Sequence, residues 1–175
     1  MEWYQGVFEL IDMRSFSNLW FWIALAVVWS STSHWVLGVP FDMVVRARRK
    51  GGQAEEDLET IVRVNVNRML MIARVSGLWI MGLVSFGLTG LVLLGWVYAL
   101  EFAQALFLLA FPMTLVALLS LRTASRIERE MPRGEVLRQR LSRHRLVTQL
   151  IGTVSIFVTA TWGMYQNMTF GALGA

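Results

Sequence analysis

The most reactive polar residues of this chain form one cluster, the sequence SSTSH at residues 30–34, inside an otherwise apolar stretch. An ionisable residue within a membrane span is a functional candidate by default. His34 could therefore ligate haem, bind a quinone or relay protons. Haem commonly takes a second axial donor, and no other apolar stretch contains a histidine. The alternative that we favour is a structural hydrogen bond from His34 to Ser30, one turn earlier, or to a facing carbonyl.

The sequence lacks the parts from which most enzyme sites are built. Without cysteine it can form no disulfide, thiolate metal site, thiolate-held iron–sulfur cluster or catalytic thiol. It also has no phosphate-binding loop, no metal-ligand pair at helical spacing, no nucleophile elbow and no carboxylate within an apolar stretch. We therefore expect a protein that is not an enzyme and needs no cofactor, with His34 as its single candidate cofactor ligand.

Three other residues in apolar stretches could serve a function. Pro112 could kink its helix and free a carbonyl for a transport site, although such prolines also occur in spans that transport nothing. Gln104 and Gln149 lie near predicted helix ends, where we interpret them as ordinary interfacial residues. A small membrane subunit of a transporter is therefore one alternative function. A haem or quinone redox-complex subunit using His34 is another.

Four apolar stretches are long enough to cross a membrane, which takes about 20 residues. These stretches are residues 19–39, 75–98, 102–121 and 146–165. None of them contains Asp, Glu, Lys or Arg, and hydrophobic residues make up 55% of the chain, which excludes an ordinary soluble domain. We predict an all-α fold, a polytopic membrane protein with four transmembrane helices in an antiparallel bundle. Short helical extensions should reach into the cytoplasm.

Positive charge is distributed unevenly along the chain. Of the 16 Lys and Arg residues, all but Arg14 fall in residues 40–74 and 122–145. Lys and Arg are retained on the cytoplasmic side, so both segments should be cytoplasmic and both termini periplasmic. This pattern predicts a multi-pass protein of the cell inner membrane. Residues 1–18 should form an amphipathic arm on the outer surface of that membrane, and residues 166–175 an outside tail.

The basic residues suggest which partners the chain has. The net charge is +4, but the bases interrupt apolar stretches instead of forming a folded polar domain, so we expect no nucleic-acid partner. The bases should contact the lipid bilayer, a cytoplasmic protein, or both. The residues that we predict for these contacts are Arg46, Arg48, Arg49, Lys50, Arg138, Arg140 and Arg143. The chain could also form an oligomer.

Apolar spacing predicts that residues 55–98 form one helix, roughly 66 Å long, of which about a third projects into the cytoplasm as a basic stalk. The apolar stripe of this stalk consists of Leu58, Ile61, Val62, Met69 and Ile72. An exposed stripe should be buried against something. One alternative is a cytoplasmic partner, which would make the chain a non-enzymatic accessory or scaffold protein. The other is internal packing against Ile127, Met131, Leu137 and Leu141.

Small and hydroxyl side chains mark the faces where membrane helices pack closely. One such seam in the last helix consists of Leu137, Leu141, His144, Thr148, Gly152, Ser155, Thr159 and Trp162. Matching faces could come from Gly82, Ser85 and Thr89 in the second span and from Ala26, Ser30 and Ser33 in the first. Trp29 is unusual because it lies in the middle of a span, whereas tryptophan favours the membrane–water interfaces.

The sequence WYQGVFELIDMRSFSNLWFWIALA at residues 3–26 is followed by SHWVLGVPFDMVVRARRKGG at residues 33–52. This part of the chain resembles a group of short, uncharacterised membrane proteins of the alphaproteobacterial type, some of which bear the label "component of SufBCD complex". The resemblance implies an accessory role beside the iron–sulfur assembly machinery. It therefore also implies a cytoplasmic protein partner.

Overall fold

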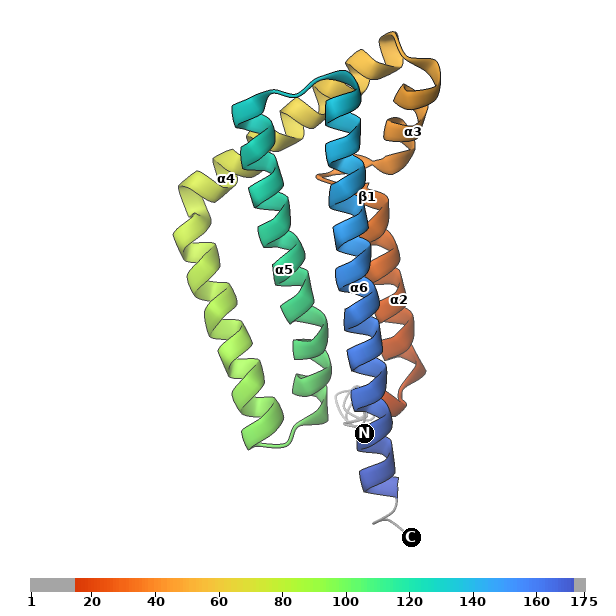
Figure 1. The fold of residues 1–175 in the computed structure, drawn as a ribbon. Helices are drawn as coiled ribbons and strands as arrows, with labels where there is room; N and C mark the ends of the chain where they lie inside the picture. Colours follow the sequence, from red (N-terminus) through yellow and green to blue (C-terminus); the bar gives the residue numbers. More distant parts are fainter. Residues whose placement is uncertain (1–14, 172–175) are drawn as a thin grey trace, which may run out of the picture.

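The computed structural model describes residues 15–171, and nearly all of them are helical (Figure 1). Five α-helices make up most of the fold: α2 (Leu19–His34), α3 (Phe41–Lys50), α4 (Gln53–Val92), α5 (Glu101–Glu130) and α6 (Gly134–Gly171). A 3-10 turn, η1 (Ser15–Ser17), precedes α2, and a π-helical segment, η2 (Leu93–Val97), extends α4. The all-α prediction is confirmed. Residues 1–14 of the predicted arm and 172–175 of the predicted tail lie outside the described residues.

Three helices in the described part of the chain are long and apolar enough to cross a membrane. They are Gln53–Val97, Glu101–Glu130 and Gly134–Met168. Helix α2 has 16 residues, or about 24 Å of helix, which is shorter than the about 20 residues that a helical span needs. The prediction of one continuous helical span over residues 19–39 is therefore wrong.

A short β-hairpin ends α2 five residues before the predicted boundary. Strand β1 (Trp35–Val36) pairs antiparallel with β2 (Val39–Pro40). Between them, Leu37 and Gly38 have φ angles of 52° and 74°. Two successive positive φ values are typical of a tight hairpin turn, in which glycine is unstrained and leucine is not. Leu37 and the valines on either side of the turn are buried, and this burial offsets the strain.

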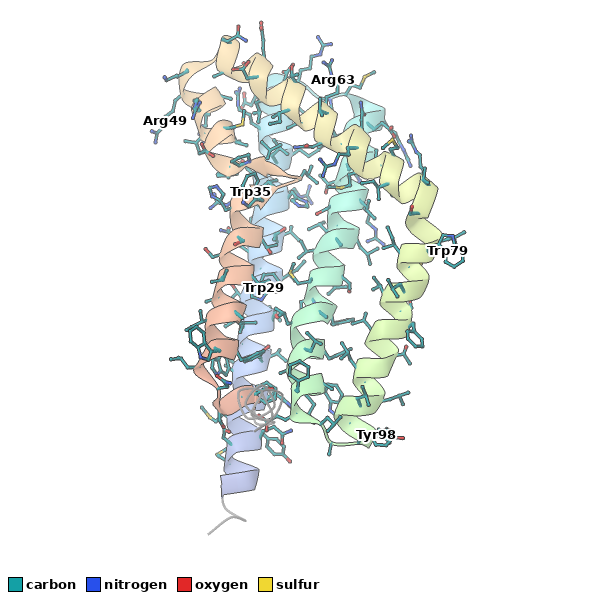
Figure 2. The ribbon with its side chains drawn as sticks, turned by 180° about the vertical axis from the view of Figure 1, so that it is seen from behind. Trp29, Trp35, Arg49, Arg63, Trp79 and Tyr98 are labelled. Carbon is teal, nitrogen blue, oxygen red and sulfur yellow. The ribbon has the colours of Figure 1, made fainter. Side chains whose placement is uncertain are left out.

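Helix α4 continues through η2, as predicted for residues 55–98, but it is not a straight rod. Figures 1 and 2 show that it bends near its middle, so that its first half lies across the ends of α5 and α6 and its second half runs beside α5. Ser76 and Gly77 lie just before Trp79, which Figure 2 places beyond the bend. Gly/Ser pairs are a common cause of helix kinks. The part of this helix predicted as a stalk therefore packs across the other helices instead of continuing straight beyond them.

The sequence predicts both turns between the long helices, because residues 99–101 alone separate two apolar stretches and because Pro132 and Gly134 interrupt the next connection. Both turns are confirmed. Only three residues separate η2 from α5, and Ala99 among them has a φ angle of 54°. Helix α5 ends at a left-handed cap, Met131, and Gly134 with a φ angle of 55° begins α6. These turns bring α5 back beside α4, and α6 back beside α5 (Figure 1).

Buried apolar side chains form two clusters. The larger one joins the hairpin, α3, the first half of α4, the end of α5 and the start of α6. The smaller one joins Leu25 and Trp29 of α2 to Val116 of α5 and to Ile151 of α6. Helix α2 thus packs against α5 and α6. The second half of α4 is hardly buried at all.

Candidate functional site

The basic end of the molecule is the part formed by α3, the first half of α4, the last turns of α5 and the first turns of α6. Helix α3 begins directly after Pro40 and buries Val44 and Ala47 in the larger cluster. Its last turn carries three bases, where cations interact favourably with the helix dipole. Four predicted contact residues are exposed together on this helix: Arg46, Arg48, Arg49 and Lys50. Figure 2 shows Arg49 of α3 and Arg63 of α4 at this same end of the molecule.

The apolar stripe of α4 is covered from within the molecule. Leu58, Val62, Val66 and Leu70 are each at most 5% exposed. They pack in the larger cluster against Ala124 and Ile127 of α5 and Leu137 and Leu141 of α6. Of the two alternatives for this stripe, internal packing is the one found. Ile72, predicted to belong to the stripe, is 45% exposed instead. The stripe therefore gives no argument for an external partner.

Acidic residues of the basic end join its helices together. Glu55 of α4 pairs with Arg138 of α6, and the Glu59 carboxylate accepts a hydrogen bond from the backbone N–H of Gly134 at 2.8 Å. Glu128 of α5 pairs with Arg74 of α4 at 2.6 Å. These contacts hold the turn between α5 and α6 against the first half of α4.

Two of the predicted contact residues serve this internal network. Contact with lipid or a partner requires that Arg138, Arg140 and Arg143 face outward, and Arg143 does, because it is exposed. Arg138 and Arg140 do not, because their side chains are only 19% and 24% exposed. Arg140 pairs with Glu130, a residue beyond the apolar stretch of α5. The hydrogen bond from Arg140, together with the positive charges of Arg140 and Arg126, lowers the pKa of Glu130 below its usual value.

His34 is the last residue of α2, directly before the hairpin. It is exposed, makes an edge contact with Trp35, and lines a shallow pocket with bases of α3 and with Arg145. Within residues 15–171 no hydrogen bond involves its ring, so the expected bond to Ser30 is not present. The same described residues contain no group of three His, Asp or Glu side chains that could hold a metal. Arg145, which is not among the predicted contact residues, donates from Nε to the Ser33 carbonyl at 3.1 Å.

His144 is the buried histidine of the molecule, 5% exposed and outside the apolar stretch 146–165 of α6. Its Nδ1 lies 3.2 Å from the Thr123 hydroxyl and its Nε2 lies 3.4 Å from the Ser120 hydroxyl. Burial lowers the pKa of His144, because the charged imidazolium loses its hydration. His144 therefore crosses the α5–α6 interface as a neutral, hydrogen-bonded side chain.

The carbonyl that Pro112 frees has a partner within the molecule. A proline removes its own N–H and so frees the carbonyl four residues earlier, here that of Leu108. The hydroxyl of Ser155 on α6 donates to that carbonyl at 3.4 Å. The freed carbonyl thus has a partner in the neighbouring helix, and it supports helix packing.

Gln104 is buried where η2, α5 and α6 meet, so its interpretation as an ordinary interfacial residue is wrong. It is 4% exposed, and its Nε2 donates to the Gly95 carbonyl of η2 at 2.7 Å. Its Oε1 accepts hydrogen bonds from the Trp162 indole and from Gln166, both on α6. One side chain therefore joins η2, α5 and α6 at the end opposite to the basic end. Gln149, in contrast, is exposed.

The predicted seam of α6 is confirmed. Seven of its eight residues are buried: Leu137, Leu141, His144, Thr148, Gly152, Ser155 and Thr159. Trp29 packs against Gly152, which explains a tryptophan at mid-helix. The prediction of matching faces on α2 and on the second half of α4 is wrong. Ala26 and Ser30 are exposed, because α2 packs through Leu25 and Trp29 instead. The face of α4 that contains Gly82 is also exposed.

Comparisons with known protein families, with curated proteins and with solved structures found no match to this chain. The fold and the basic end themselves define the class: within residues 15–171, a mainly helical protein with three helices of membrane-crossing length and composition, and with bases gathered at one end.

Proposed function

We propose that this chain is a four-span protein of the cell inner membrane, with both termini periplasmic and the basic end in the cytoplasm. The positive-inside distribution of its bases supports this orientation. Helix α2 counts as the remaining span, because its 16 residues contain no Asp, Glu, Lys or Arg and Trp35 extends its apolar stretch toward the lower end of the length that spans have. The four helices would then cross the bilayer as an antiparallel bundle.

Within that topology the chain acts as a non-enzymatic accessory or scaffold protein that docks a cytoplasmic partner by charge. The observation that carries this proposal is the exposed group Arg46, Arg48, Arg49 and Lys50 on α3. Val44 and Ala47 anchor this helix in the larger cluster, so the four bases are presented on a fixed surface. An acidic face of another protein is the chemistry that such a surface recognises. The resemblance of residues 3–52 makes the iron–sulfur assembly machinery the first partner to test.

Reporter fusions test the topology. Alkaline phosphatase fused after Ala175 should be active, because it folds in the periplasm, and the same reporter fused after Gly52 should be inactive. A fluorescent protein that is dark when exported should give the opposite pattern. Active phosphatase at Gly52 together with inactive phosphatase at Ala175 would refute the four-span orientation.

Cross-linking in native membranes tests the docking. Arg46, Arg48, Arg49 and Lys50 are reversed together to Glu, and the matched control reverses four other exposed bases of the same end, Arg63, Arg68, Arg129 and Arg133. Arg138 and Arg140 are unsuitable for reversal, because their internal ion pairs would break. A docked iron–sulfur assembly protein should be lost from the α3 variant and retained by the control. Loss from both variants, or from neither, would refute docking at α3.

The redox alternative has a direct spectroscopic test. The purified protein should show no Soret band, because His34 lies exposed among bases rather than in an apolar haem pocket. A stoichiometric band that His34→Ala abolishes would put the haem function first.

A further inference from the structure

A pocket of about 430 Å³ lies between the end of α5 and the start of α6, within the about 300–1,000 Å³ typical of ligand sites. Arg126 of α5 and Arg140 and Arg143 of α6 line it. Glu130 is the acid in this lining, and His144 is neutral. The pocket therefore has an excess of positive charge.

The guanidinium groups of this pocket have unused donors. Glu130 occupies Nη2 of Arg140, while Nη1 of the same side chain is buried without a hydrogen-bond partner in the described part of the chain. Arg126 and Arg143 are exposed, and neither forms a salt bridge within residues 15–171. The exposed guanidinium groups of Arg126 and Arg143 can therefore donate charge-assisted hydrogen bonds to an anion in the pocket.

The floor of the pocket is neutral and already paired. The Ser120 hydroxyl donates to the Val116 carbonyl at 2.8 Å, so its oxygen is free to accept from Nε2–H of His144. Nδ1 of His144 then accepts from the Thr123 hydroxyl. The charged donors that remain for a ligand are the guanidinium groups, and their planar geometry matches the oxygens of a phosphate. Gln139, which also lines the pocket, donates from Nε2 to Glu135 at 3.0 Å.

The pocket also changes character along its length. Leu119 lies seven residues deeper in α5 than Arg126, and Val147 lies seven residues deeper in α6 than Arg140. Seven residues are about 10 Å of helix, and Leu119 and Val147 lie within the apolar stretches 102–121 and 146–165. Val136, the other apolar residue of the lining, lies at the charged end. A ligand that fits is charged at one end and apolar at the other. A free phosphate would leave the apolar part of the pocket empty.

We propose that this pocket binds the phosphate group of an anionic phospholipid, with the guanidinium groups of Arg126, Arg140 and Arg143 around the phosphate and an acyl chain along Leu119 and Val147. Basic pockets between membrane helices on the cytoplasmic side suit such headgroups. This inference rests on the proposed topology, which brings the pocket to the level of the cytoplasmic headgroups.

The test uses the full chain in a neutral detergent, titrated with dioctanoyl phosphatidylglycerol and followed by native mass spectrometry. Dioctanoylglycerol, which has the same chains without the phosphate, is the ligand control. The test variant is Arg126→Gln with Arg143→Gln, because neither residue holds an internal ion pair. The matched variant is Arg48→Gln with Arg49→Gln on α3, which removes the same charge elsewhere at the basic end.

The phosphatidylglycerol affinity should fall about tenfold or more in the pocket variant and stay within about twofold in the α3 variant, while dioctanoylglycerol binds weakly to all forms. Equal losses in both variants would show diffuse attraction and overturn the proposal. If inorganic phosphate competes as well as the lipid does, the source is a free phosphate and the lipid assignment is overturned. Binding in detergent does not depend on membrane orientation. A failed lipid titration would therefore not contradict the proposed topology. Reporter fusions with the opposite pattern would contradict the topology without changing the measured lipid affinity.

Discussion

Gly152 of α6 lies directly against the indole of Trp29, and replacing it with alanine tests whether α2 packs against α6 in this way. A Cβ atom at Gly152 would lie 2.7, 3.1 and 3.2 Å from three carbon atoms of the Trp29 ring. The ring has little room to move, because Trp29 is 4% exposed and packs with Leu25 and Val116. Gly152→Ala should therefore strain the contact between the helices.

The magnitude follows from a comparison with a second glycine. Overpacking a well-packed site costs about 1–3 kcal/mol, while Gly→Ala within a helix gains about 1 kcal/mol of helix propensity. A Cβ atom at Gly82 of α4 would have nothing within 4 Å, so Gly82→Ala keeps the propensity gain without the clash. The difference between the two variants isolates the steric cost of about 1–3 kcal/mol. At about 2–4 °C per kcal/mol, Gly152→Ala should melt roughly 2–12 °C below Gly82→Ala.

Circular dichroism during heating in a mild detergent measures this difference. The double variant Trp29→Leu with Gly152→Ala adds a second readout, since a smaller side chain removes the clash. The penalty of Gly152→Ala should then shrink when it is measured against Trp29→Leu alone. Equal melting temperatures for Gly152→Ala and Gly82→Ala, or an unchanged penalty in the Trp29→Leu background, would refute the packing of α2 on Gly152.

Three further predictions concern polar contacts and use the same melting assay. Gln104→Leu should destabilise the protein more than Gln149→Leu, because each buried group left unpaired costs about 1–3 kcal/mol and Gln149 is exposed. Similar losses of stability in the two variants would contradict the hydrogen bonds of Gln104 to η2 and α6. Arg138→Gln should destabilise more than Arg46→Gln, whose exposed pair with the carboxylate one turn away contributes about 0–1 kcal/mol; the reverse order would contradict the internal network. The lowered pKa of His144 means that the unfolded chain takes up its proton first, so stability should fall as pH drops below 6.5, by at most about 1.4 kcal/mol per pH unit. His144→Gln should remove this part of the pH dependence.

Local patterns predicted the features of this fold that depend on residues near one another in the chain. The seam of α6 follows from heptad-like spacing, and the turn at Met131 and Gly134 from a proline and a glycine between two apolar stretches. The early end of α2 could not be predicted in this way. Residues 35–39 are as apolar as the helix before them, and hydropathy does not distinguish a buried hairpin from another turn of helix.

Contacts between distant segments account for the other errors. Arg138 lies next to buried Leu137 on α6, and its acidic partner lies on α4, far away in the sequence. Helical periodicity alone therefore placed this arginine on the outer face. Gln104 shows the same limit, because its three partners lie on η2 and α6. An amide near a helix end looks like an interfacial residue until the elements that surround it are known.

The contacts of Gln104 also explain how α4 stays packed against α5 although the second half of α4 is exposed. Its first half is fixed in the larger cluster by residues such as Leu58 and Leu70. Its other end is fixed through η2, where the Gly95 carbonyl accepts from Gln104 and a Cβ at Gly95 would lie only 3.0 Å from the Gln104 side chain. Between these two attachments the helix bends beside Ser76 and Gly77 and buries little of its surface. A residue larger than glycine at position 95 would thus push η2 away from α5 and leave the whole second half of α4 attached at one end.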